Sequence, residues 1–591
     1  MATTAQGEGR QLRRGVGVIG LTFFALGSVI GSGWLFGARN AASVAGPAAI
    51  LSWPIAGVML LVIILSFAEL APSYPVAGGM YRLAHYSYGG LGGFTMGWVS
   101  WLFSMSLIAI EVEAAIEYLS GLQHLGWLLN ANGDLSMPRG FLIAVALALL
   151  FALVNMYSVT LFAHTNAAVV WWKIAIPVVT VIALAFSIKG SNYTAAGGFL
   201  PEATSDFGGV KGIFLALPLA VVFAEIGFDS AIQMAGEARN PKRDLIRAVF
   251  YSTIIGVVVY TLLQVVFIGA MPAKYLGSGW AGMATVFTKD IHGPYVLMAS
   301  VAGLAWLMIL LYIDAAASPS GTAFIYTGTQ ARLLYGMSKQ GYLPPPAKTL
   351  NRHGVPWVGV LTGWAGSVLL FLPFPSWSSL VAAITSVAVI SYCVGPAALT
   401  HFRKADPDRE RTFRVPAANL IAPLGFVFGT LLVYWTGWGT MWRVDAGIIL
   451  GLLIMGGYYF ARPKPARPSL DAAHSLWMWL WLIGINVFTL LGAFQGWPGK
   501  TPQELDSWYH PLSLLKFPYD TIWVAVFAVL IYVLIQATAL PPEKTRQYIE
   551  ADSQEADWTV DADDKAEVGL GLEPRISGLC SRSDSGKVRQ G

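Results

Sequence analysis

The stretch LGSVIGSGWLFG, residues 26–37, interrupts the first long apolar segment of the chain near its middle. Four of its twelve residues are glycine, and glycine costs about 1 kcal/mol relative to alanine inside a helix. The pattern predicts that the helix opens here. Open backbone inside a membrane is tolerated where it is buried in protein or lines a cavity, and its free N–H and C=O groups can bind a small molecule or an ion. A packing face for a neighbouring helix is the alternative.

The composition places the chain among polytopic membrane proteins. Of its 591 residues, 55% are hydrophobic and 12% are charged, which is far from the usage of soluble globular domains. The hydrophobic residues fall in runs of about 20, the length of a transmembrane helix, and not in the alternating pattern of barrel strands. About fourteen helical spans are predicted, at residues 16–44, 47–70, 92–119, 140–161, 166–188, 211–236, 246–271, 296–337, 356–374, 377–400, 418–437, 444–461, 474–494 and 520–540.

Basic residues cluster in the N-terminal segment 1–15 and in the loops after the sixth, eighth, tenth and twelfth spans. All of these segments lie on one side of the membrane, because successive spans alternate in direction. The positive-inside rule therefore predicts that both chain termini are cytoplasmic. Because the clusters are accounted for as topology determinants, a nucleic-acid partner is disfavoured. The tail 541–591 is charged and poor in aromatic residues, which predicts a disordered cytoplasmic segment.

Ionisable residues inside spans are functional candidates, because charges are costly in the apolar core of a membrane. The third span contains Glu111, Glu113 and Glu117. Glu117 is near the end of the span and is interpreted as a solvated helix terminus. Glu111 and Glu113 lie deeper and point roughly 200° apart on a helix, so they cannot face one cavity, and we favour Glu111. Lys173 lies about two turns into the fifth span, where snorkelling to the membrane edge is the alternative to a functional role.

The sequence FAEIGFD, residues 223–229, places a glycine between two acidic residues in the middle of the sixth span. It repeats the pattern of the first span five helices later, so each break begins a set of five spans. This spacing predicts an inverted repeat of residues 16–188 and 211–400. The last four spans, residues 418–540, contain no comparable interruption and are interpreted as peripheral. The eighth span carries a Pro/Gly break at residues 318–322, whose hydroxyl groups can satisfy freed backbone groups or coordinate an ion.

Motifs at five places, in order along residues 15–461, resemble the amino acid-polyamine-organocation superfamily of permeases. They are GSG at 31–33, PVAGGMY at 75–81, FAEIGFD at 223–229, EARNPKR at 237–243, and RLLYGMSKQGYLP at 332–344 followed by GVP at 354–356. The chain has two spans more than most members of the superfamily. This feature and the run from Asp314 to Thr322 are most similar to the bacterial aspartate/proton symporter branch. The resemblance implies an all-α, multi-pass protein of the bacterial inner membrane. Its fold would be the leucine-transporter fold, two inverted five-helix repeats with broken helices 1 and 6, plus about four extra C-terminal helices.

The same resemblance implies that an amino acid is held between the breaks of spans one and six. The backbone at Ser32 and Gly33 would bind its carboxylate, since half-helix N-termini favour anions. Carbonyl groups at the breaks would bind its ammonium group, and Phe223 occupies the position of an aromatic gate. The implied substrate-binding residues are Ile30, Ser32, Gly33, Phe223, Ala224, Glu225, Ile226 and Gly227.

Lys173 matches a lysine that, in proton-coupled relatives, stands where sodium-coupled members bind their cation, and Glu111 matches an acidic position of several branches. Glu225 departs from the family, which usually has an aromatic residue there. An ionised Glu225 would suit a basic substrate. A protonated Glu225, the form that burial favours, would donate a hydrogen bond to an acidic side chain and supply a proton-coupling step. The predicted proton-coupling residues are Lys173, Glu111, Glu225 and Asp229.

The sequence therefore predicts proton-coupled uptake of amino acids by alternating access, with aspartate or glutamate favoured as the substrate. The alternatives are an amino acid or amine exchanger without net proton coupling and a non-transporting nutrient sensor. The eight histidines lie mostly in loops or at span ends, so neither a metal site nor an enzyme activity is predicted. The proton is the expected coupling ion, with no cofactor besides. The expected partner is the lipid bilayer, and a monomer and a homodimer both remain open.

Overall fold

The computed structural model describes residues 16–74, 80–122, 124–157, 159–203, 207–233, 238–283, 293–494 and 511–552. Within these ranges the chain forms helices and their connections, with no β-strand and only two isolated bridges. The chain divides into a unit of residues 12–546, which holds α1 to α20, and a unit of residues 1–11 and 547–591. The predicted all-α class is confirmed.

The first span is broken where the glycine cluster predicts. It consists of α1, Val18–Val29, and α2, Gly33–Ala45. Ile30 leaves the helical region with φ −89° and ψ 83°, and the chain resumes as a helix at Gly33. The residues on both sides of the opening are buried, so the freed backbone groups face protein and not lipid.

The sixth span is broken as well. Its pieces are α7 (Gly209–Ala216), a π-helical turn (η4, Leu217–Val221), α8 (Val222–Glu225) and α9 (Phe228–Gln233). Ile226 is extended, with φ −78° and ψ 155°, and Gly227 has φ 139°, a value that favours glycine. Both predicted breaks are therefore present, each at the head of a set of five spans.

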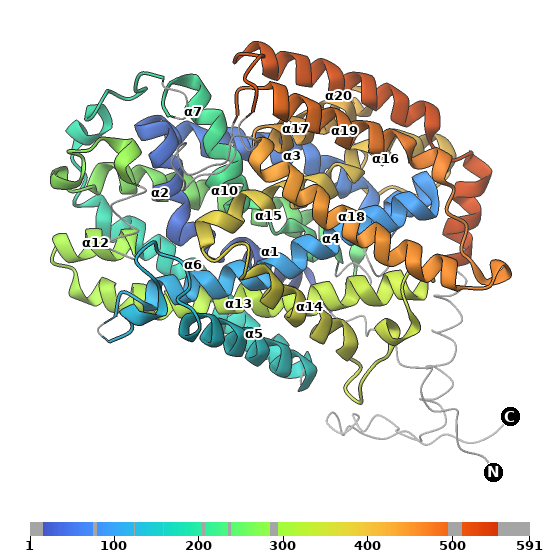
Figure 1. The fold of residues 1–591 in the computed structure, drawn as a ribbon, viewed down its shortest axis with the longest axis horizontal. Helices are drawn as coiled ribbons and strands as arrows, with labels where there is room; N and C mark the ends of the chain where they lie inside the picture. Colours follow the sequence, from blue (N-terminus) through green and yellow to red (C-terminus); the bar gives the residue numbers. More distant parts are fainter. Residues whose placement is uncertain are drawn as a thin grey trace, which may run out of the picture. The chain divides into compact units, whose positions relative to one another are not determined.

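The remaining helices of the two sets pack around these breaks. The first set continues with α3 (Ala49–Ser73), α4 (Met80–Leu119), α5 (Arg139–Tyr157) and α6 (Val159–Ala185). The second continues with α10 (Pro241–Ala270), α13 (Ala305–Lys339), α14 (Trp357–Leu370), α15 (Trp377–Tyr392) and α16 (Val394–Ala405). In Figure 1, α1, α4, α13 and α15 lie close together, and α13 packs along α4 while α10 packs along α1 and α3. This order of elements is that of the leucine-transporter fold.

The eighth span differs from its prediction at two points. The predicted single span 296–337 is two helices, α12 (Pro294–Val301) and α13. They are separated by Gly303, which has φ 72°. At this turn the Leu304 N–H donates a hydrogen bond to the Ala299 carbonyl at 2.8 Å, which ends α12. The predicted break at 318–322 is absent, because α13 runs through Pro319 without interruption. Neighbouring helices can satisfy the groups that a proline frees inside a membrane helix.

Four helices follow the two repeats: α17 (Ala418–Tyr434), α18 (Trp438–Ala461), α19 (Leu476–Leu491) and α20 (Tyr519–Thr538). Figure 1 shows α17, α19 and α20 side by side, in agreement with their mutual packing, and α18 packs on α4 and α15. The predicted disordered tail begins too early, because residues 542–552 are helical. The rest of that segment, 553–591, lies outside the described residues.

The helices account for the predicted membrane spans. Within the described ranges, nine helical segments are long and apolar enough to cross a membrane, and four shorter apolar helices are Val18–Val29, Val169–Ala185, Trp357–Leu370 and Ala418–Tyr434. The sixth span adds none to this count, because its break divides it into short pieces. The nine long segments, the four shorter helices and the broken sixth span correspond to the fourteen predicted spans.

Candidate functional site

The two helix breaks lie directly against each other. A Cβ atom on Gly33 would lie 2.7 Å from the Ala224 Cα atom, and one on Gly227 would lie 2.6 Å from the Val29 nitrogen. Only glycine permits so close an approach of two backbones. The glycines of the two breaks thus allow spans one and six to meet at the points where both helices are open.

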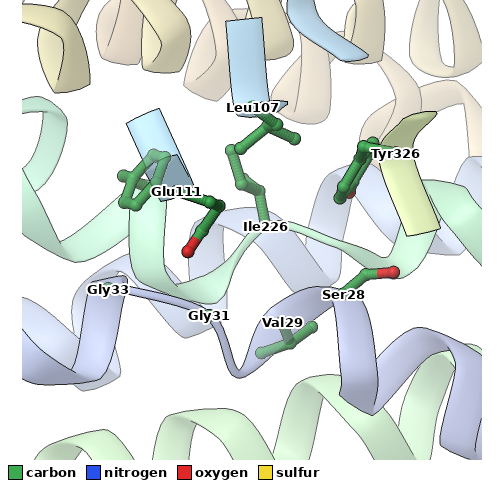
Figure 2. A pocket seen from close by; sticks show the side chains of 9 residues that line it. Ser28, Val29, Gly31, Gly33, Leu107, Glu111, Ile226 and Tyr326 are labelled. Carbon is green, nitrogen blue, oxygen red and sulfur yellow. The ribbon is translucent and has the colours of Figure 1, made fainter. Parts of the chain in front are cut away.

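A small cavity lies at this junction. Figure 2 shows the Glu111 side chain from α4 directed toward the open backbone at Gly31, with Tyr326 of α13 on another side. The cavity has room for about one water molecule, so an amino acid can enter only after the helices move apart. The lining residues are Ser28, Val29, Gly31, Gly33, Leu107, Glu111, Phe223, Ile226 and Tyr326.

The backbone N–H of Ser32 donates a hydrogen bond to Oε2 of Glu111 at 2.8 Å. This N–H belongs to the group that the resemblance assigns to the substrate carboxylate, so a carboxylate of the protein itself occupies that position. The Ser32 hydroxyl accepts a bond from Nε1 of Trp377 at 2.8 Å. Glu111 is 2% exposed. Of the two deep acids of the third span, it is the one that lines the cavity.

Lys173 is fully buried beside the first break. Its Nζ donates to the Gly27 carbonyl at 2.5 Å and to the Thr322 hydroxyl at 2.7 Å. The Gly27 carbonyl lies near the C-terminal end of α1, where the helix dipole favours a cation. The ammonium therefore points into the protein and does not snorkel toward the surface.

Asp229 stands at the start of α9, immediately after the second break. Its Oδ1 accepts a hydrogen bond from the Tyr392 hydroxyl at 2.7 Å and one from the Tyr326 hydroxyl at 3.3 Å. Tyr326 also lines the cavity. Asp229 is thus one contact away from the cavity wall, and it connects the second break to α13 and α15.

Glu225 is 1% exposed, and neither of its oxygens has a hydrogen-bond partner among the described residues. It does not line the cavity, although the next residue, Ile226, does. Glu113 on the third span is equally buried and equally unpartnered in the part of the chain that the structure describes. A buried carboxylate without a partner is costly when ionised, so both positions suit a neutral carboxylic acid.

The predicted substrate-binding residues thus fall into two groups. Gly33, Phe223 and Ile226 line the cavity. The others lie on the same two open segments or next to them without lining it, namely Ile30, Ser32, Ala224, Glu225 and Gly227.

Some contacts that hold the site were not predicted. The Tyr260 hydroxyl of α10 donates to the Val29 carbonyl at 2.8 Å, and no sequence signal indicates this. Glu117, interpreted as a solvated helix end, is instead buried and paired with Arg39 of α2 at 3.4 Å. An arginine inside an apolar segment requires a partner, so Arg39 was the signal that could have revealed this pair. No group of residues suited to a metal ion occurs in the described ranges.

The sequence of the chain is similar to those of known amino acid permeases. A family model described as "Amino acid permease" matches residues 16–454. The chain is 34% identical over 551 residues to the glutamate/serine transporter AimA of Bacillus subtilis (strain 168), covering 92% of this chain and 97% of that protein. It is 32% identical over 532 residues to the aspartate-proton symporter of the same organism, covering 90% and 97%. Both similarities extend well beyond the segment that the family model matches.

Proposed function

Because the chain belongs to the amino acid permease family, within the amino acid-polyamine-organocation superfamily, we propose that it takes up acidic amino acids together with protons by alternating access. It is a multi-pass membrane transporter of amino acids and not an enzyme. Proton coupling and the acidic substrate are the proposed part. The observation that carries the proposal is the buried Lys173 ammonium, which connects α1 to α13 beside the first break.

The Lys173 ammonium group acts as a removable cation. While it is protonated, its charge and its N–H groups hold the Gly27 carbonyl of α1 to Thr322 of α13. When the proton leaves toward the cytoplasm, the charge is lost and the attraction to the carbonyl end of α1 weakens. The broken helices can then move away from α13, which opens the site.

Glu111 links the proton to the substrate. Its carboxylate accepts the Ser32 N–H, which is the group expected to bind the carboxylate of an amino acid. Two carboxylates cannot share this N–H without strong repulsion. Protonation of Glu111 removes its charge and frees the N–H for the substrate, so that a proton and an amino acid are loaded together.

The acidic substrate is supported by the names of two relatives, which include aspartate in one case and glutamate in the other. Glu225 is the candidate for contact with the substrate side chain. It is buried and unpartnered among the described residues, and as a neutral acid it would donate a hydrogen bond to a carboxylate once α8 shifts. Glu225→Leu, which removes the donor, should then change the preference for aspartate over leucine by about tenfold or more, because a hydrogen bond to a charged group is worth about 1.5–3 kcal/mol. An unchanged preference in competition assays would assign Glu225 a structural role.

The energetics favour two protons per substrate. A monoanionic amino acid that enters with one proton moves no net charge, so the membrane potential, which supplies about 2.3 kcal/mol per charge per 100 mV, would be unused. With two protons, one positive charge enters per cycle. Lys173 and Glu111 are two separate groups that can carry these protons.

The basic clusters favour an orientation with both termini in the cytoplasm of a bacterial cell and the protein in the inner membrane. Under this orientation, α1 leads from the cytoplasm to the break, and α2 continues to the outer face. The loops after the sixth, eighth, tenth and twelfth spans are then cytoplasmic.

The test is uptake by proteoliposomes that contain the purified protein, without sodium. Labelled aspartate, glutamate, serine, arginine, lysine and leucine are compared with and without an inward proton gradient. We expect aspartate or glutamate to accumulate, and this accumulation to collapse when the gradient is dissipated. Uptake that occurs only when the liposomes are preloaded with amino acid would indicate an exchanger. The absence of both uptake and counterflow would indicate a sensor, and either result would overturn the proposal.

A further inference from the structure

One face of α13 is polar although it is buried inside the membrane region. Asp314, Ser318 and Thr322 are spaced four residues apart, which places them on one side of a helix, and each is at most 1% exposed. We propose that Asp314 is a proton-binding residue of the transport cycle in addition to Lys173 and Glu111, and that this polar face of α13 connects it to Lys173. The inference rests on the proposed proton coupling.

The contacts of Asp314 tie it to the moving part of the protein. Its Oδ2 accepts a hydrogen bond from Nε1 of Trp34 at 3.1 Å, and its Oδ1 accepts one from the Ser318 hydroxyl at 2.6 Å. Trp34 belongs to α2, directly after the first break, and its ring stacks on Tyr295 of α12 with 5.5 Å between centroids. Asp314 therefore depends on α2 for one of its donors.

The other end of the polar face touches α1 before the break. Thr322 accepts a hydrogen bond from Lys173 and donates one to the Gly27 carbonyl at 3.0 Å. A Cβ atom on Gly31 would lie 2.8 Å from its hydroxyl oxygen. A single face of α13 thus contacts span one on both sides of its opening, with Lys173 at one end and Asp314 at the other.

The balance of charges indicates that one of the two carboxylates beside Lys173 binds a proton once it loses its hydrogen-bond donors. Two carboxylates act electrostatically on the Lys173 ammonium, those of Glu111 and Asp314. One ammonium neutralises one carboxylate, and a second buried carboxylate is costly unless it is paired or protonated. The other titratable groups that interact with Asp314 are Tyr118 of α4 and Tyr260 of α10, which are neutral phenols. Arg39 of α2 is engaged by Glu117.

The contact with Trp34 couples this proton to the conformation. In the conformation described here, two donors point at the Asp314 carboxylate, an arrangement that suits the ionised form. When α2 moves away from α13, the Trp34 donor leaves. The carboxylate then favours a proton, so opening of the site and proton binding at Asp314 promote each other.

A merely structural role predicts something different. If Asp314 only fastens α2 to α13, its replacement changes stability and turnover, while the number of protons moved per amino acid stays the same. The deciding measurement is therefore the proton-to-substrate ratio. It is obtained in proteoliposomes from the reversal of labelled glutamate flux at a series of imposed pH gradients.

The first variant is Asp314→Asn, and its control is Asp445→Asn. Asp445 belongs to the peripheral helix α18, and its carboxylate lies beside Asn486 of α19. We expect Asp314→Asn to retain glutamate counterflow, which needs no net proton movement, and to move one proton fewer per glutamate. The control should keep the wild-type ratio. An Asp314→Asn protein with the wild-type ratio would overturn the inference.

The second variant, Trp34→Phe, removes the N–H donor and keeps an aromatic ring to stack on Tyr295. Because one donor to a charged group is lost, we expect the half-maximal pH of glutamate uptake to rise by about one unit. An unchanged pH profile would contradict the role of Asp314 even if Asp314→Asn fails to fold. If the wild-type protein moves no protons with its substrate, the proposed function fails. If the wild-type protein moves protons and both variants keep its proton-to-substrate ratio and pH profile, the inference about Asp314 alone fails.

Discussion

Glu111 accepts the same Ser32 N–H that an incoming amino acid would require, and this conflict is the basis of the coupling proposed for the carboxylate. The sequence could identify Glu111 as a candidate because an acid in an apolar span is costly. It could not show which group Glu111 meets, because Ser32 lies 79 positions away and their contact depends on packing. Lys173 is similar, since the sequence showed a lysine inside an apolar span and could not show its partners Gly27 and Thr322.

Glu111→Gln tests this coupling at the level of one side chain. Glutamine keeps the size of the side chain and cannot be ionised, so the competitor for the Ser32 N–H no longer depends on pH. We expect the KM for aspartate, measured by counterflow, to become insensitive to pH over about pH 5.5–8. The wild-type KM should rise toward high pH, where Glu111 is ionised. A variant with the wild-type pH dependence would remove Glu111 from the mechanism.

At the level of elements, the two breaks were predictable and the ends of the eighth span were not. The cost of glycine in a helix is a local property, so the four glycines at 26–37 and the single Gly227 between two acidic residues at 223–229 revealed both openings. Pro319 suggested a third opening, but α13 continues through it, because a membrane helix tolerates a proline where its surroundings can satisfy the freed backbone groups. Gly303, which does end a helix, lies in a stretch that is apolar on both sides, so its neighbours give no sign of a helix end.

Gly33→Ala tests the contact between the broken helices. The added methyl group would lie 2.7 Å from the Cα atom of Ala224, and backbone cannot move aside cheaply. We expect a loss of about 1–3 kcal/mol in stability, seen as a lower midpoint of thermal unfolding in detergent, together with loss of counterflow. Gly456→Ala on α18 is the matched control, because nothing lies within 4 Å of its added Cβ. Equal behaviour of the two variants would show that the contact is not required.

For the whole molecule, composition predicted a helical membrane protein and the spacing of the two helix breaks predicted two repeats, and the order of the helices bears this out. The relation between distant helices was not predictable from patterns. The Trp377 indole reaches the Ser32 hydroxyl across 345 positions. Such contacts arise only when all spans pack together, so the architecture was accessible from the sequence and the site's hydrogen bonds were not.

The charge moved per cycle is a property of the whole molecule. With two protons per monoanionic amino acid, an inside-negative potential of about 100 mV supplies about 2.3 kcal/mol, which corresponds to about 50-fold greater accumulation at equilibrium. We expect a potassium diffusion potential set with valinomycin to drive aspartate accumulation into proteoliposomes. Accumulation that responds to the pH gradient and ignores the potential would instead mean one proton per substrate.

The most direct test of the central claim records proton entry and aspartate entry together in proteoliposomes that carry wild-type protein or Lys173→Ala, with a pH-sensitive dye trapped inside. Lys211→Ala is the control, because the Lys211 ammonium also contacts a backbone carbonyl, that of Ala493, away from the breaks. We predict that wild type and control acidify the lumen as aspartate accumulates. Lys173→Ala should exchange aspartate without acidification and without accumulation beyond the outside concentration. Proton-driven accumulation by Lys173→Ala at the wild-type level would contradict the account.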